Sequence, residues 1–492
     1  MVFSSAVFLF YFFPLFLLLY YTLPWKNAVL LVGSLLFYAW GEPRYVPLLM
    51  LSAFLNYAFG YLIGGARARG GPDSTAKTLL ALGIGINLAM LAYYKYLGFF
   101  AAIANALALR EGALPAIVLP LGISFFTFQG ISYLIDVYRR DIAAQTSFWT
   151  FAMYKAMFPQ LIAGPIVRYR QIASEVDTRD ISNARLWFGF RLFILGLAQK
   201  VLIANSVALA ADRLFGVDPS RLDAAGAWIG VACYTVQILF DFAGYSTMAI
   251  GIGHMLGFSY PPNFDRPYSA RSITEFWRRW HISLSSWFRD YLYIPLGGNR
   301  ASPLRTYFNL GLVFLLCGLW HGAAWTFVIW GAWHGALLIA ERLGGSAVLA
   351  RLPGVVAQAW TLLCVMVGWV FFRAESVPYA LGYLGSMFGL RDGAVAAHPW
   401  RADVGTTALV ALAAGLALSL WRPAARATAP AAAPPAVPAA AAAPAPAAPA
   451  WQPQRRGVLA VGGQVAFSAL LALLCIASLA AGTYNPFIYF RF

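Results

Sequence analysis

Apolar runs long enough to cross a lipid bilayer recur along the whole of this 492-residue chain. A spanning helix needs about 20 predominantly apolar residues, and roughly ten to thirteen such runs can be counted here. Only 11% of the residues are charged, whereas soluble domains carry about 25%. The sequence therefore predicts an all-α polytopic membrane protein. Several runs are too short to cross alone, and we expect these to form re-entrant or interfacial helices.

The formal charge of +16 raises the possibility of a nucleic-acid partner. However, the basic residues form neither a solvated block nor a zinc or RNA-binding signature. They lie in short segments between apolar runs, as the positive-inside rule describes for cytoplasmic loops. We expect membrane lipids as partners and no nucleic acid. The four cysteines are scattered singly in apolar runs, which indicates no metal site.

An almost pure Ala/Pro tract divides the chain into unequal parts. Frequent prolines exclude a continuous helix, so we expect an extended cytoplasmic linker over residues 423–455. Residues 1–422 would then form the transmembrane core, with the chemistry concentrated in residues 240–342. Residues 456–492 would add one more transmembrane helix and a tail.

The segment 275–300 is rich in arginine and tryptophan inside a chain that is otherwise apolar. Its tryptophans are spaced three and then seven residues apart, so they share one face of a helix: Trp277, Trp280 and Trp287. This pattern predicts an amphipathic helix at the membrane interface. One interpretation is a lipid anchor with snorkelling arginines. The other is a cationic mouth for a phosphate-rich donor, built by Arg278, Arg279 and Arg289. His281 favours the second, since an anchor has no need of an imidazole.

His321 stands in an almost wholly apolar setting between Trp320 and Trp325. Ionisable residues at membrane depth are expensive and are usually functional. A histidine has an unperturbed pKa near 6.5, which suits proton transfer at neutral pH. The alternative is a structural histidine bonded to a neighbouring helix. His334 follows thirteen residues later, which is about 20 Å along one straight helix, so it could not pair with His321 there.

The absence of other catalytic motifs restricts the type of reaction that the chain could catalyse. The sequence has no GxSxG elbow, HExxH, Walker A or GxGxxG fingerprint. Asp241 and Asp136 are carboxylates in apolar runs, but each stands alone. A histidine without a nearby nucleophile fits a base that activates a substrate hydroxyl for direct attack on a thioester. A covalent acyl-enzyme fits less well.

Four longer motifs resemble those of the membrane-bound O-acyltransferase (MBOAT) family, in particular its bacterial alginate O-acetylation branch. The motifs are FPQLIAGPIVRY (158–169), FDFAGYSTMAIGIGHMLG (240–257), FWRRWHISLSSWFRDYLYIPLGGNR (276–300) and GLWHGAAWTFVIWGAWHG (318–335). The likeness covers nearly the whole chain apart from the Ala/Pro tract. At Thr247 the family pattern often has an acid, so a carboxylate role there is not expected.

The resemblance implies a bundle of about eleven transmembrane helices around a tunnel. It also implies that His321 is catalytic and that His281 is the second polar position of the active site, where we expect it to orient or polarise the donor carbonyl. We assign the donor and substrate contacts to Arg278, Arg279 and Arg289 together with Asp241 and Trp320. The expected donor is acetyl-CoA or an acyl carrier thioester, used as a substrate and not as a bound cofactor. The expected partners are a polysaccharide acceptor and a periplasmic SGNH-type acetyltransferase, at the bacterial inner membrane.

Two other functions are compatible with the residues. A transporter or flippase could also place histidines along a polar path, although no two-fold internal repeat is visible. A non-catalytic scaffold of a polysaccharide secretion complex would need neither histidine.

Overall fold

The computed structural model describes residues 1–69, 72–108, 117–300, 302–390, 398–422, 458–482 and 484–488. All regular secondary structure in these ranges is helical, with no strand, which confirms the predicted all-α class. The expected linker over residues 423–455 lies outside the described residues.

Seven helical stretches in the described ranges are long and apolar enough to cross a membrane. They are Pro43–Ala68, Asp73–Ala106, Asn183–Leu214, Ala224–Met255, Pro303–His321, Gly354–Arg373 and Val461–Ala480. Two shorter apolar helices, Phe8–Thr22 and Thr406–Leu420, are too short for the same criterion. The chain is therefore a multi-pass membrane protein, but the expected number of about eleven spans is not confirmed.

The described residues fall into two compact units. Unit 1 is drawn from residues 1–197, 245–261 and 458–473, and unit 2 from 198–244, 262–422 and 474–488. Two α-helices are divided between the units, namely α12 (Ala224–Met255) and α21 (Val458–Ala480), and the last residue of α10 (Asn183–Ala198) also falls in unit 2.

Unit 1 contains ten α-helices in the described ranges besides its parts of α12 and α21. These are α1 (Phe13–Thr22), α2 (Lys26–Gly41), α3 (Val46–Ala68), α4 (Asp73–Leu91), α5 (Leu97–Ala106), α6 (Ile123–Arg139), α7 (Phe148–Ala156), α8 (Phe158–Leu161), α9 (Tyr169–Ile172) and α10 (Asn183–Ala198).

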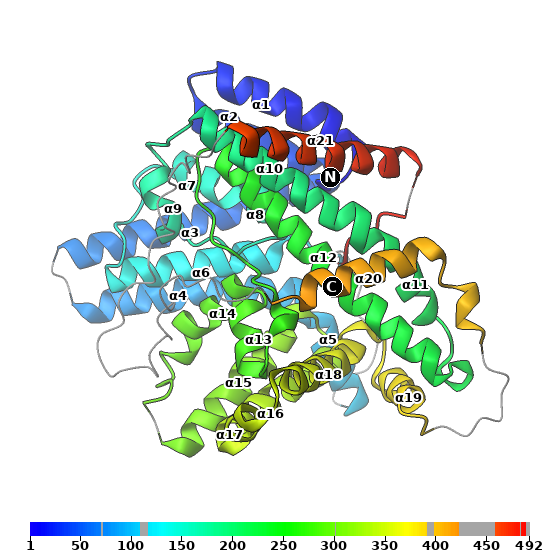
Figure 1. Cartoon of the computed structure of the whole chain (residues 1–492). Coiled ribbons are helices and arrows are strands. Elements are labelled where there is room, and N and C mark those ends of the chain that lie inside the picture. Colours follow the sequence, from blue (N-terminus) through cyan, green and yellow to red (C-terminus); the bar gives the residue numbers. More distant parts are fainter. Residues whose placement is uncertain are drawn as a thin grey trace. The chain divides into compact units, whose positions relative to one another are not determined.

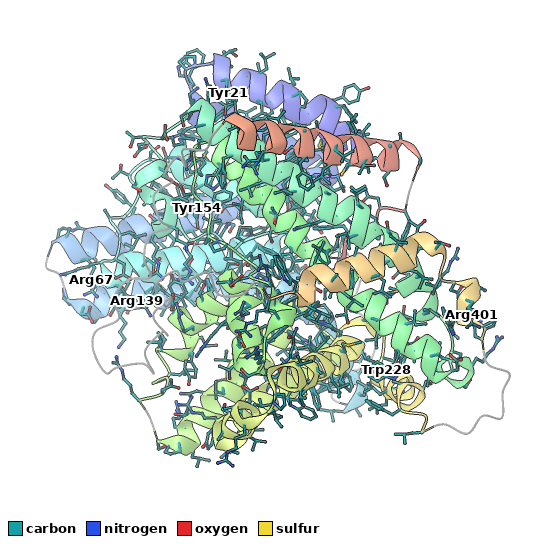
Figure 2. The ribbon with its side chains drawn as sticks, in the orientation of Figure 1. Tyr21, Arg67, Arg139, Tyr154, Trp228 and Arg401 are labelled. Carbon is teal, nitrogen blue, oxygen red and sulfur yellow. The ribbon has the colours of Figure 1, made fainter. Side chains whose placement is uncertain are left out.

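Helices α3, α4 and α6 pack side by side in unit 1 (Figure 1). A buried pair of amides joins α3 to α4: Asn56 Nδ2 donates to Asn87 Oδ1 at 3.1 Å, and Asn87 Nδ2 donates back at 2.9 Å. Polar pairs of this kind hold helices together where lipid replaces water. At one end of the group, where Figure 2 labels Arg67 and Arg139, Arg67 pairs with Asp73 at 2.6 Å.

Unit 2 contains the remaining helices of the described ranges. These are α11 (Asn205–Leu214), α13 (Ile273–Arg279), α14 (Ile282–Phe288), α15 (Pro303–His321), α16 (Trp325–Ala340), α17 (Ser346–Arg351), α18 (Gly354–Arg373), α19 (Val377–Met387) and α20 (Thr406–Leu420). A π-helical turn, η5 (Gln199–Ala204), precedes α11, and a second, η8 (Arg289–Tyr293), follows α14.

Helices α15 and α16 form a close hairpin in unit 2 (Figure 1). The chain reverses over residues 322–324. Two glycines permit the close approach, because a Cβ at Gly318 would lie 2.2 Å from the carbonyl oxygen of Phe327, and one at Gly331 would lie 2.3 Å from that of Phe314. Small residues allow helix backbones to approach in this way. The hairpin fixes where His321, the last residue of α15, can lie.

The arginine-rich segment differs from its prediction as one amphipathic helix. It forms two short helices, α13 and α14, which are separated at Trp280 and His281. His281 adopts a left-handed backbone conformation with φ +42°, which breaks the helix and turns the tryptophan face inward. Trp277, Trp280 and Trp287 are all buried in the protein. Their burial explains the correction, since ring packing inside the unit replaces the expected contact with lipid.

Candidate active site

His321 lies at the tip of the α15–α16 hairpin and is almost fully buried. Aromatic rings surround its imidazole. The ring centroids of Trp320, Trp330 and Phe372 lie 5.0, 5.1 and 5.1 Å from that of His321. Each of these rings meets the imidazole edge to face, which restricts its rotation. The histidine expected to be catalytic is therefore held in one orientation by packing.

A small enclosed cavity of about 10 Å³ opens beside His321. A cavity of this size holds about one water molecule. Its walls come from α12, the α13–α14 region, the hairpin, α18 and a residue beyond α21: Ile238, Phe242, Trp280, His321, Trp330, Trp369, Phe372 and Ile488. His321 is the one histidine among them, so a hydroxyl entering this space would meet an imidazole with little competing water.

His281 lies near His321, with 6.4 Å between the two ring centroids. Its Nδ1 is 3.1 Å from Oδ1 of Asn263, a buried residue of the loop after α12. Asn263 also fixes the backbone there, because its carbonyl oxygen accepts the Ile282 N–H at 2.9 Å. Thus the loop after α12 positions the second histidine.

The hydrogen bonds at Asn263 define the tautomer of His281. The Ser283 N–H, which can only donate, is 3.2 Å from Asn263 Oδ1, so that atom is the amide oxygen. An oxygen accepts, and His281 Nδ1 must therefore carry the proton and donate it. This leaves Nε2 as an acceptor, and Nε2 has no hydrogen-bond partner among the described residues. Burial lowers the pKa of His281 to about 3, so the ring is neutral.

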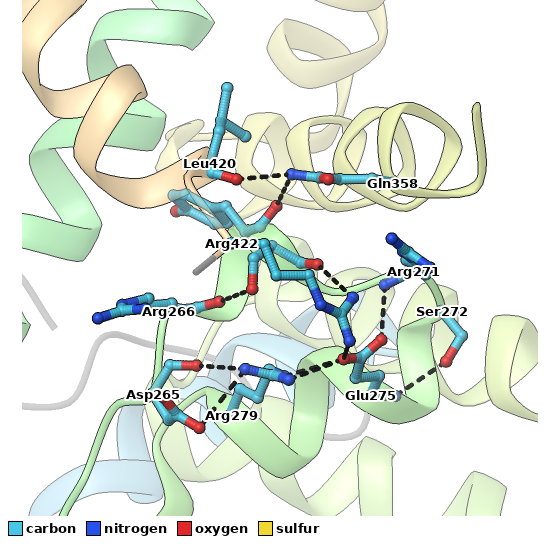
Figure 3. A network of polar contacts seen from close by, with 11 residues as sticks. Asp265, Arg266, Arg271, Ser272, Glu275, Arg279, Gln358, Leu420 and Arg422 are labelled. Atoms are coloured by element: carbon cyan, nitrogen blue, oxygen red, sulfur yellow. Dashed lines mark hydrogen bonds and ion pairs between the residues drawn. The ribbon is translucent and has the colours of Figure 1, made fainter. Parts of the chain in front are cut away.

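Arg279 belongs to a network of ion pairs on the surface of unit 2 (Figure 3). Its Nη2 lies 2.9 Å from Glu275 Oε1, and its Nη1 lies 3.4 Å from Asp265 Oδ2. Arg422 shares the same carboxylate at 3.2 Å. Figure 3 also shows that Glu275 accepts the backbone N–H of Arg271 at 2.8 Å. The charge of Arg279 is therefore already balanced by protein carboxylates.

The other two predicted arginines have different surroundings. Arg278 is exposed, and its side chain makes no hydrogen bond or ion pair within the described ranges. Arg289 is exposed and pairs with the adjacent Asp290 at 2.7 Å. Of the three arginines, Arg278 has the charge most available to an anionic ligand. Their assignment to the donor stays a prediction.

The two remaining predicted contacts, Trp320 and Asp241, have different surroundings. Trp320 is buried, with its ring 5.0 Å from His321 and 6.0 Å from His281. The carboxylate of Asp241 instead forms an ion pair with Lys200, at 2.6 Å. Its other oxygen accepts the backbone N–H of Ile488 at 2.8 Å. A donor contact for either residue stays a prediction.

The hairpin also connects His334 to the site. Its Nδ1 accepts from Trp277 Nε1 at 3.3 Å, and its ring lies 5.2 Å from Trp330, which in turn contacts His321. The expectation based on one continuous helix does not apply, because α15 ends at His321. Trp330 therefore separates the two histidines.

Sequence reasoning missed several residues of the site. Asn263 was one, and its only signal was a lone amide in a proline-containing loop. The others are cavity walls contributed by α12, α16 and α18: Phe242, Trp330, Trp369 and Phe372. In a chain this rich in aromatics, such rings cannot be distinguished from ordinary core residues without the fold.

Comparison with known proteins identifies the class. Residues 139–349 match the model of the MBOAT, membrane-bound O-acyltransferase family. These residues include α12, both histidines and the α15–α16 hairpin.

Individual relatives agree with this match. The chain is 42% identical over 505 residues to the probable alginate O-acetylase AlgI of Pseudomonas putida, covering all of both chains. It is 37% identical to the peptidoglycan O-acetyltransferase of Helicobacter pylori, over 79% of this chain and 80% of the relative. A teichoic acid D-alanyltransferase of Bacillus subtilis is 29% identical over 42% of this chain and 54% of the relative. The chain belongs to the MBOAT family and is a membrane O-acyltransferase.

Proposed function

We propose that this protein takes an acetyl group from a cytoplasmic thioester and passes it across the bacterial inner membrane for O-acetylation of an exopolysaccharide, alginate or one like it. The observation that supports this most directly is His321, packed against the small cavity of unit 2 in a chain whose full-length relatives include a probable alginate O-acetylase. A transporter or a scaffold explains neither the buried histidine at the cavity nor the likeness to a probable O-acetylase.

His321 acts as the general base in this proposal. It removes the proton from the acceptor hydroxyl as the hydroxyl oxygen attacks the thioester carbonyl. A C–O bond forms, the C–S bond breaks, and the leaving thiolate takes up the proton from the imidazolium. A positioned base of this kind contributes typically 10²–10⁴ in rate. The aromatic walls exclude water, which would otherwise compete with the acceptor for the thioester.

His281 has a positioning role in this scheme. Its Nδ1–H is used on Asn263, so the neutral ring offers a lone pair at Nε2 and not a proton. Both polarising and orienting a carbonyl oxygen through a hydrogen bond require a donor, so this tautomer does not fit the role expected for His281 on the donor carbonyl, and we propose that the ring positions the acceptor hydroxyl or His321 instead. In this role Nε2 of His281 accepts a hydrogen bond, either from the acceptor hydroxyl or from the imidazole of His321.

The proposed donor and partners are argued from the exposed arginine and from the relatives, and not from the cavity. We propose acetyl-CoA or an acyl carrier thioester as the donor, with Arg278 the first of the arginines to meet its phosphates, because that side chain is exposed and unpaired within the described ranges. We further propose that a periplasmic SGNH-type acetyltransferase completes transfer to the sugar. The relatives named for O-acetylation of alginate and of peptidoglycan support a polysaccharide acceptor in general.

The substitution His321→Ala tests the reaction. We expect transfer of acetyl groups to polysaccharide to fall by about 10²- to 10⁴-fold, in line with loss of a general base, while the protein is still made and inserted. The measurement is acetyl content of the exported polymer together with the amount of the variant in the membrane fraction. Unchanged acetylation would remove His321 from the mechanism and leave the scaffold function standing.

The chain offers a matched histidine control. His398 lies outside the cavity and pairs with Asp403 at 2.5 Å. The substitution His398→Ala removes an imidazole without touching the site, so acetylation should stay at the level of the unaltered protein.

A second experiment distinguishes an acyltransferase from a transporter. Uptake or export of polymer in the absence of a thioester donor would favour a transporter.

A further inference from the structure

Residues 484–488, which follow α21, form a short segment that we call the strap. The strap is held in unit 2 by side chains from other elements. Tyr484 donates through its hydroxyl to Asp212 Oδ2 at 2.8 Å, and Asn485 Oδ1 accepts from Asn205 Nδ2 at 3.0 Å. Phe487 and Ile488 are buried. The strap is therefore docked over its whole length.

The centre of this docking is a buried ion pair. Lys200 and Asp241 have side-chain exposures of 4% and 1%, and Lys200 Nζ lies 2.6 Å from Asp241 Oδ1. Two charges removed from water cost more than their attraction returns, unless further polar groups satisfy them. Asn205 of α11 supplies one such group, since its Oδ1 accepts from Lys200 at 2.8 Å, and the strap supplies two more. Lys200 donates to the carbonyl oxygen of Pro486, and Asp241 accepts the Ile488 N–H at 2.8 Å.

The same backbone places a side chain at the catalytic cavity. Ile488, whose N–H is bound by Asp241, forms one wall of the cavity that contains His321. Lys200 lies in the π-helical turn η5, where an additional residue per turn displaces side chains from their usual register. Such turns are frequent at functional sites. The ion pair, the strap and the cavity thus form one connected structure within unit 2.

We propose that Lys200 and Asp241 are positioning residues that hold the strap as a wall of the catalytic cavity. Their charges matter to the reaction through where they place Ile488, and the pair does not touch the reacting atoms. The acyl-transfer readout rests on the proposed function, whereas the position of the strap can be measured without any activity.

The position of the strap is measured by thiol labelling. All four native cysteines are buried, so the purified full-length protein in detergent should react slowly with a maleimide. The substitution Ile488→Cys adds a reporter on the strap. With the ion pair intact, we expect its labelling to be nearly as slow as that of the native cysteines. Fast labelling of the reporter in this background would overturn the proposal.

A charge exchange separates positioning from folding. The double substitution Lys200→Asp with Asp241→Lys preserves opposite charges, but an aspartate cannot donate to the Pro486 carbonyl and a lysine cannot accept the Ile488 N–H. We expect thermal stability to recover relative to either single substitution. Reporter labelling should be at least about tenfold faster, and transfer at least about tenfold slower, each equivalent to about 1.4 kcal/mol. Restoration of slow labelling and full transfer would show that the pair serves the fold alone.

A milder variant covers the case in which the exchanged protein does not fold. Asn485→Ala leaves Lys200, Asp241 and Asn205 in place and removes one strap contact. We expect labelling of the Ile488→Cys reporter to rise at least threefold, and unchanged labelling would contradict the proposal.

The matched control is Glu175→Gln, which weakens the buried Arg185–Glu175 pair of unit 1 at 3.3 Å. The reporter should label at the unperturbed rate in this background. Faster labelling here would mean that general loosening, and not strap release, controls the reporter. If His321→Ala kept full acetylation, the proposed function would fail while the labelling results stood.

Discussion

The two histidines of the site are held in place by different means. His321 ends a long apolar helix, and its orientation depends on the backbone contact of α15 with α16 and on three aromatic rings. His281 separates two short helices, and its orientation depends on hydrogen bonds to Asn263. Packing is non-directional but depends on shape, whereas hydrogen bonds set both direction and tautomer. The proposed base is therefore positioned by the shape of the rings packed around it, and His281 is positioned by the hydrogen bonds at Asn263, which we call the polar clamp.

Among substitutions that leave both histidines in place, the largest expected effect comes from disturbing the hairpin. Gly318→Ala would place a methyl group 2.2 Å from the Phe327 carbonyl oxygen, so α15 and α16 must separate and His321 must move. A displacement of about 1 Å can cost 10² in rate. We expect transfer to fall about 100-fold at a given amount of membrane-inserted protein.

Gly311 provides a control on the same helix. A Cβ there meets nothing within 4 Å, so Gly311→Ala should leave transfer unchanged. If the two substitutions lowered transfer equally, the cause would be the change in helix propensity of α15 and not the close approach of α15 to α16.

An intermediate effect is expected from the polar clamp. Asn263→Ala removes the acceptor of the His281 Nδ1–H and leaves that group buried without a partner, which costs about 1–3 kcal/mol. The imidazole is then free to rotate or change tautomer, and we expect kcat to fall by about 10- to 100-fold with little change in the KM for the donor.

Steady-state kinetics on purified protein would measure this, with Asn299→Ala as the control because Asn299 is exposed. If Asn263→Ala raised KM and left kcat alone, Asn263 would act in binding and not in orienting His281.

The smallest effect distinguishes two adjacent arginines of the His281 segment. Arg278 is exposed and has no ion pair within the described ranges, whereas Arg279 is paired with Glu275 and Asp265. We expect Arg278→Ala to raise the donor KM by about 3- to 10-fold, with a weaker dependence on salt than in the unaltered protein. Arg279→Ala should change KM less and lower thermal stability more. The reverse order would locate the donor phosphates at Arg279.

Much of the class and part of the site could be predicted from the sequence. The apolar runs determine an all-helical membrane protein, and His321 is conspicuous because few side chains near it can carry a proton. The break at His281 could not be predicted, because the tryptophan spacing fits a continuous helix and a left-handed histidine has no signature in the sequence. The Lys200–Asp241 pair was equally hidden, since its members are 41 positions apart and only the fold brings them together.

The left-handed conformation of His281 also bears on attempts to stabilise the protein. A non-glycine residue held at φ +42° costs about 1–3 kcal/mol, and glycine would adopt the same backbone without that strain. Glycine at position 281 would, however, also empty the space of a fully buried ring and break its hydrogen bond to Asn263, and emptying a core position usually costs about 2–5 kcal/mol. The strained backbone is therefore maintained by the packing and hydrogen bonding of the imidazole that it positions.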